Sequence, residues 1–159
     1  MEAGGQTYLR MMSDILRKKE THLQELLTLT KEQEHLLKAE ELDDEAFNQT
    51  IEKKDIHIKK IQEFDSGFQT IYNRIEEELK QHGAEMKEEV QNLQQLITKV
   101  TELGVSLQAL EQKNKVSMEA RLLERKRGIK QFKVSKQTAS HYYKNMVDVQ
   151  QGTFMDKKQ

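Results

Sequence analysis

Cysteine, proline and tryptophan are absent from this sequence, and aromatic residues make up only 6% of it. Without cysteine the chain can form no disulfide and has no thiol nucleophile. Without proline, no residue imposes a hard stop on a helix. The scarcity of aromatic side chains argues against a broad globular core, so we expect a core only two or three helices across.

Long hydrophobic runs are also missing, since no run of consecutive apolar residues exceeds two. A membrane-spanning helix needs about 20 such residues, and a signal peptide also needs a continuous apolar stretch. We therefore expect no membrane insertion and a cytoplasmic location, with which the lack of cysteine is compatible.

Charge is abundant instead, at 33% of the 159 residues, with a net charge of only −1. Abundant Glu, Lys, Gln and Leu are typical of long helices and coiled coils. The charges are unevenly placed: residues 32–52 hold eight acidic residues and one lysine, whereas residues 113–136 hold nine basic residues and two glutamates.

Residues 44–82 carry a ladder of side chains at alternating steps of four and three, which forms one stripe along a long helix. Lys54, Asp65 and His82 interrupt an otherwise apolar stripe. The apolar positions are Phe47, Ile51, Ile58, Ile61, Phe68, Tyr72, Ile75 and Leu79. Other helices must cover such a stripe.

A second ladder of the same spacing predicts a helix over residues 7–38, after a loose end at residues 1–6 and with Thr7 as N-cap. The next helix has a clear start signal. Asp43 can cap it, while Leu42 and Phe47 suit a hydrophobic staple. The short connection predicts that the two helices are antiparallel neighbours.

Apolar positions of these two helices pair when their residue numbers sum to 84, as Leu16 does with Phe68. The same register sets Lys19 opposite Asp65. A buried charge is costly unless it is paired, so we predict this ion pair.

A third ladder predicts a helix over residues 84–127, with Gly83 as the residue that ends the preceding helix. Pairing at a sum of 165 sets Tyr72 opposite Leu93 and Lys54 opposite Glu111, which predicts a second ion pair. Together these registers predict an all-α, elongated antiparallel three-helix bundle, residues 1–127, with residues 44–82 as its central helix.

Residues 128–159 form a C-terminal amphipathic arm and tail. Its apolar positions at helical spacing are Ile129, Phe132, Tyr142, Tyr143 and Met146. One interpretation folds this arm back on the bundle as a fourth core strip, and the other makes it a partner-binding segment. Gly128 ends or bends the third helix.

No catalytic constellation stands out. The five histidines do not form metal-ligand spacings, and there is no phosphate-binding or dinucleotide-binding glycine motif. We expect no enzyme, no cofactor and no metal site. The basic residues 113–136 are interpreted as a solvated face that balances the acidic loop, with anionic-surface binding as the alternative.

Three short stretches resemble the FlgN family of flagellar export chaperones. They are Leu23-Gln-Glu-Leu26-Leu27-x-Leu29 with Glu32-Gln33, Ile51-Glu-Lys-Lys54-x-Ile56, and Asp65-Ser-Gly67-Phe68. The resemblance covers about residues 8–120. FliT-like flagellar chaperones are similar in size and in helical build, so they are the near alternative.

The resemblance implies a cytoplasmic chaperone that binds hook-associated proteins, those of the hook–filament junction, before type III export and also meets the export apparatus. It implies that the C-terminal segment captures the substrate, through Ile129, Phe132, Tyr142, Tyr143 and Met146. Two other functions remain open. One is a structural homodimer formed through residues 107–147, and the other is a nucleic-acid or membrane binder that uses residues 113–136.

Overall fold

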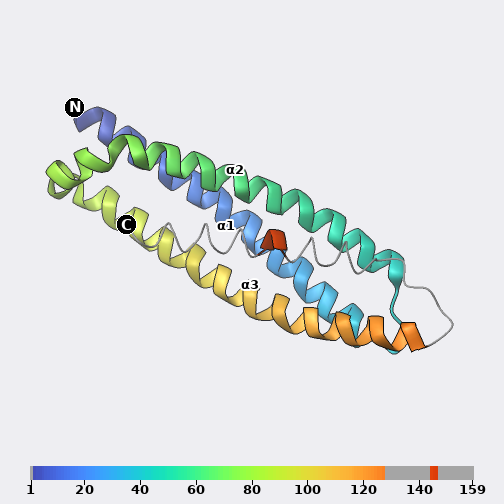
Figure 1. The fold of residues 1–159 in the computed structure, drawn as a ribbon. Helices are drawn as coiled ribbons and strands as arrows, with labels where there is room; N and C mark the ends of the chain where they lie inside the picture. The colour runs from blue at the N-terminus through green and yellow to red at the C-terminus, as the bar shows by residue number, and fades with distance from the viewer. Residues whose placement is uncertain (1, 128–143, 147–159) are drawn as a thin grey trace.

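The structure, a computed structural model, describes residues 2–127 and 144–146 (Figure 1). Over these residues it contains helices and no strand. The elements are α1 (Glu2–Lys38), α2 (Asp44–His82), the 3-10 turn η1 (Gly83–Met86) and α3 (Lys87–Arg127). The three long helices run alongside one another as an elongated antiparallel bundle (Figure 1), which confirms the predicted all-α fold.

The first helix begins earlier than the sequence predicted, at Glu2 rather than at residue 7. Gly4 and Gly5 are poor helix formers, but tertiary packing overrides that preference. Gly5 lies so close to the end of α2 that a Cβ there would come within 2.5 Å of Glu78 Oε1 and 3.1 Å of Met86 Sδ. The first turns of α1 therefore belong to the bundle.

The start of α2 follows the sequence signal. The Asp43 side chain caps the helix by accepting a hydrogen bond from the Ala46 amide at 3.1 Å. Leu42 and Phe47 are both buried, and they share a small apolar cluster with Leu37 and Met118. The cap and the staple thus fix the angle at which the chain enters α2.

The turn between α2 and α3 differs from the expected glycine-terminated helix end. Gly83 has a right-handed conformation, with φ −59° and ψ −31°, and its amide donates to the carbonyl of Leu79. The chain passes through η1 directly into α3 at Lys87. This turn therefore does not use the left-handed freedom of glycine.

The core follows the predicted stripes. Side chains from all three helices form one cluster, and most of them are almost completely buried. Its least exposed members are Leu9, Met12, Leu16, Leu23, Leu26, Ile58, Ile61, Phe68, Ile75, Val100 and Leu107. At about 25 cal/mol per Å² of apolar surface, burial of each large side chain stabilises the fold by roughly 1.5–3 kcal/mol.

The central helix is α1, so the prediction that residues 44–82 form the centre is wrong. The backbone of α1 packs closely against both α2 and α3, whereas those of α2 and α3 stay apart over most of their length. The reason lies in the width of the apolar stripe on α1. Tyr8, Ile15 and Leu27 flank the buried positions and pack against the core, so α1 can cover two helices at once.

Candidate functional site

An apolar groove opens between α2 and α3 near η1, with a volume of about 450 Å³. Its apolar lining consists of Leu9, Tyr72, Leu79, Val90, Leu93 and Ile97. Leu9 comes from α1, which lies between the other two helices, and the other five come from α2 and α3. Tyr72 and Leu93, which the sequence set opposite each other, thus line one groove between helices that do not close on one another.

The rim of this groove is polar. Glu76 and Lys80 line it from α2, and Lys80 Nζ lies 3.4 Å from Glu76 Oε1. Gln94 and Thr98 line it from α3. An apolar floor with a mixed-charge rim suits an amphipathic helix or an extended segment with a few large apolar side chains.

Met146 is the one predicted partner-binding residue within the described part of the chain. Its side chain is only 3% exposed and belongs to the same core cluster as Leu9, Leu93 and Ile97. Residues 144–146, red in Figure 1, lie between α2 and α3 about halfway along the bundle. In this structure Met146 is therefore seated on the bundle.

The other four predicted partner-binding residues lie outside the described residues, as does Gly128. These four are Ile129, Phe132, Tyr142 and Tyr143.

Lys19 and Asp65 are brought together between α1 and α2. The Lys19 ammonium donates to Asp65 Oδ1 at 2.5 Å, and the Lys19 side chain is fully buried, whereas that of Asp65 is 17% exposed. Burial raises the pKa of Asp65, and the attraction and hydrogen bond of Lys19 oppose this rise. Because the pKa of Asp65 is raised, the cost of burying its charge exceeds the attraction of Lys19. The ion pair therefore specifies the register of α1 against α2 more than it adds stability.

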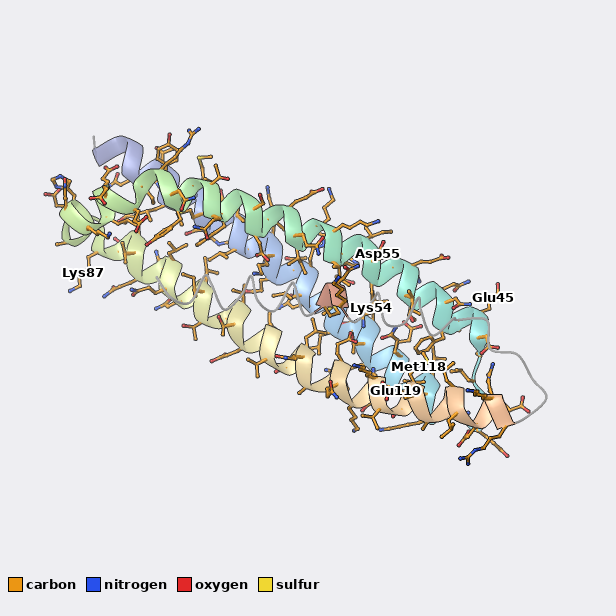
Figure 2. The ribbon with its side chains drawn as sticks, in the orientation of Figure 1. Glu45, Lys54, Asp55, Lys87, Met118 and Glu119 are labelled. Atoms are coloured by element: carbon orange, nitrogen blue, oxygen red, sulfur yellow. The ribbon has the colours of Figure 1, made fainter. Side chains whose placement is uncertain are left out.

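Lys54 of α2 and Glu111 of α3 are also brought together, and both are buried. The Lys54 ammonium donates to Glu111 Oε1 and, at 2.8 Å, to Gln33 Oε1 of α1. Figure 2 labels Lys54 on α2. Burial lowers the pKa of Lys54 to about 8, against the opposing influence of Glu111. Lys54 is therefore an ammonium ion at pH 7, held by acceptors from both other helices.

Further polar side chains complete this layer. Thr30 donates to Glu111 Oε1 at 2.9 Å, Gln33 donates to Thr50 Oγ1 at 3.0 Å, and Asn114 donates to the carbonyl of Thr30 at 2.9 Å. The network was not predicted from the sequence. The signal was present, because Thr30, Gln33 and Asn114 occupy polar positions of the ladders at the spacing of core residues.

The basic end of α3 contacts the connection between α1 and α2. Arg125 donates to Asp44 at 2.8 Å, as the complementary charges led us to expect. Arg121 binds the main chain instead. Its guanidinium donates to the carbonyls of Leu37, Ala39 and Glu40, and so satisfies acceptors that the end of α1 leaves without helical partners.

A pair of histidines, which the sequence did not predict, lies between α1 and α2. Nδ1 of His22 on α1 lies 2.8 Å from Nδ1 of His57 on α2, and Phe64 packs against the His22 ring. Burial, followed by the charges of His57 and Lys60, lowers the pKa of His22. No spacing within either helix reveals this pair, because its members flank the ladders.

Two negative findings apply to residues 2–127 and 144–146. No group of three or more His, Cys, Asp or Glu side chains there could hold a metal ion. No helix there is long and apolar enough to cross a membrane.

Comparison with known families identifies the chain. The family described as FlgN protein matches residues 9–146, which include all but the first turns of α1, the whole of α2 and α3, and the segment that ends at Met146. Comparisons with curated proteins and with solved structures return no match. FlgN is a family of chaperones and not of enzymes. The chain belongs to the FlgN family of flagellar export chaperones.

Proposed function

We propose that this chain is a cytoplasmic chaperone that binds hook-associated flagellar proteins and shields them before type III export. The observation that carries the proposal is the extent of the family match, which reaches beyond α3 to residue 146. The family match thus includes residues 128–146, which hold all five of the apolar positions at helical spacing in the C-terminal arm.

The partner-binding residues that we propose are Ile129, Phe132, Tyr142, Tyr143 and Met146. Helix-in-groove binding accounts for their apolar character and spacing, because a partner's amphipathic segment can cover them. Met146 is buried on the bundle in the free chain. Capture through this residue therefore requires it to leave the bundle and to exchange one apolar partner for another.

The geometry supports a binding protein in another respect. Three of the six basic side chains in residues 113–127 contact other parts of the chain: Arg121 and Arg125 bind the α1–α2 connection, and Lys113 Nζ lies 3.0 Å from Glu34 Oε2. Contacts of this kind reduce the charge that residues 113–127 offer to an anionic surface. They favour the chaperone over the nucleic-acid or membrane binder.

The test is binding of a purified hook–filament junction protein, measured by calorimetry with the full-length chain and with a chain truncated after Lys126. We expect truncation to abolish binding. Because truncation also removes Met146 from the core cluster, circular dichroism and denaturant unfolding must show that the truncated bundle stays folded.

A full-length variant separates binding from folding. Replacement of both Tyr142 and Tyr143 by alanine should weaken binding at least tenfold, whereas replacement of the exposed Lys144 by alanine should leave it unchanged. Full affinity in the truncated chain or in the double tyrosine variant would contradict the proposed role of the arm.

A further inference from the structure

The groove between α2 and α3 is an apolar surface that the helices leave uncovered near η1. Tyr72, Leu79 and Val90 are only partly buried there, although they pack against the main core. Leu9 reaches the floor of the groove and is 1% exposed. The groove therefore has apolar walls, an apolar floor and an open top.

We propose that this groove is the docking site for the tail of the same chain, residues 147–159. The proposal concerns the free protein and needs no client. It goes beyond the capture of a client by the arm, and it can fail without that function failing.

The position of residues 144–146 carries the first step. Helix α3 ends at Arg127, at the same end of the bundle as the α1–α2 connection. Residues 144–146 lie about halfway back along the bundle between α2 and α3 (Figure 1), and Met146 is buried in the common core cluster. Residues 144–146 therefore lie nearer than the end of α3 to η1, where the groove opens.

The length of the remaining chain carries the second step. Thirteen residues, 147–159, follow Met146. They would span about 20 Å as a helix at 1.5 Å per residue and roughly 43 Å if extended at 3.3 Å per residue. That is a substantial part of α3, which spans about 60 Å at the same helical rise. The tail is thus long enough to continue from the middle of the bundle along the groove.

The composition of the tail carries the third step. Val147, Phe154 and Met155 offer apolar side chains, and Lys157 and Lys158 follow directly after Asp156. The groove offers an apolar interior large enough for an aromatic ring, and a rim with both Glu76 and Lys80. Burial of Phe154 and Met155 in this groove would remove them from water, which is the main source of affinity in apolar docking.

The absence of cysteine from the chain allows a direct test by cross-linking. The tail variant Thr153→Cys is combined with Gln94→Cys on the exposed rim of the groove. The matched control combines Thr153→Cys with Lys18→Cys, an exposed position on α1. Both full-length double variants are treated with a short bismaleimide, and the intramolecular product is quantified by mass spectrometry.

We expect the variant with Thr153→Cys and Gln94→Cys (the groove pair) to give at least a fivefold higher yield of intramolecular product than the variant with Thr153→Cys and Lys18→Cys (the control pair). In the groove pair, a further change of Phe154 and Met155 to serine should reduce the yield to that of the control, whereas Asp156→Asn should not. Equal yields for the two pairs would overturn the proposal. So would a yield that is unaffected by the serine changes, or a product that is mainly a cross-linked dimer, which would make a second copy the occupant.

Discussion

The two ends of the bundle are built differently. At the loop end, where α1 meets α2, a buried polar layer around Lys54 and Glu111 connects all three helices, and Arg121 and Arg125 attach α3 to the connection. At the turn end, near η1, α2 and α3 line an apolar groove of about 450 Å³. One end is closed by specific polar contacts, and the other leaves apolar surface open.

The difference between the two ends shows how one short chain can fix the register of its helices and still accept a partner segment. Apolar stripes alone permit several registers, because each turn of a helix offers a similar surface. A buried ammonium ion whose acceptors lie on two other helices is satisfied in only one register. The loop end therefore fixes the alignment, which leaves the turn end free to accept a partner segment without loss of the fold.

The largest expected effect is on the loop end. Replacement of Lys54 by methionine leaves the Glu111 carboxylate buried without its main partner, and removal of one member of a buried pair costs about 3–5 kcal/mol. We expect a decrease of that size in the free energy of unfolding, measured with urea.

The double variant Lys54→Met with Glu111→Leu is the matched control. It removes both charges, so it should recover most of the stability, while losing some specificity of helix alignment. A single variant as stable as the native chain would show that the polar layer does not hold the loop end.

Much of this architecture could be predicted from the sequence, because it follows from side-chain periodicity. The stripes yield the three helices, and the charged positions within them bring Lys19 to Asp65 and Lys54 to Glu111. Periodicity does not tell which helix is central. That depends on the width of each stripe, and the flanking Tyr8 and Ile15 make α1 the broader one.

The site was less predictable for two physical reasons. A groove arises where two stripes fail to meet, and a register that pairs Tyr72 with Leu93 does not reveal the distance between their backbones. Main-chain acceptors cannot be read from a pattern of side chains, so the sequence did not predict that Arg121 binds main-chain carbonyls. The early start of α1 depends on Gly5 packing against Glu78 and Met86, which is a tertiary contact.

The next largest effect is expected at the Lys19–Asp65 ion pair, which lies between the loop end and the turn end of the bundle. Lys19→Asp or Asp65→Lys alone sets like charges against each other next to the core, and each should reduce the free energy of unfolding by about 2–3 kcal/mol. The exchange of both should recover most of that loss, as a double-mutant cycle would show. Absence of any recovery would mean that the pair does not act as a unit.

A smaller effect is expected at the end of α3. Arg121→Gln removes charge-assisted hydrogen bonds to the carbonyls at the end of α1, at a cost of about 1–2 kcal/mol. Lys126→Gln, at an exposed position of the same helix, is the control and should change stability by less than about 0.5 kcal/mol. Equal effects of the two changes would indicate that only net charge matters there.

The smallest effect is the pH dependence at the histidine pair. The pKa of His22 in the folded chain is below its ordinary value of 6.5, because burial and then the charges of His57 and Lys60 disfavour its proton, while Glu25 favours it. As the pH falls, His22 therefore becomes protonated in the unfolded chain before it does so in the folded chain. The contribution of neutral His22 to the free energy of unfolding is present above pH 6.5 and is lost as the pH falls below this value.

Denaturant unfolding between pH 7.5 and pH 5 measures this loss, and His22→Leu should make the curve flatter. Asp65 acts in the opposite direction, because its pKa is raised in the folded chain. Its protonation favours the fold as the pH falls, so only the difference between native and variant curves isolates His22. Identical slopes would show that the histidine pair does not resist protonation.

The unequal ends are tested most directly by hydrogen exchange in the free, full-length chain, followed by mass spectrometry of peptides from α2 and α3. Peptides that contain Lys54 and Glu111 should exchange slowest, and those that contain Tyr72 and Leu93 should exchange faster, because, within the described residues, the groove near η1 leaves α2 and α3 without a direct polar connection there. Slower exchange at the turn end than at the loop end would contradict the account.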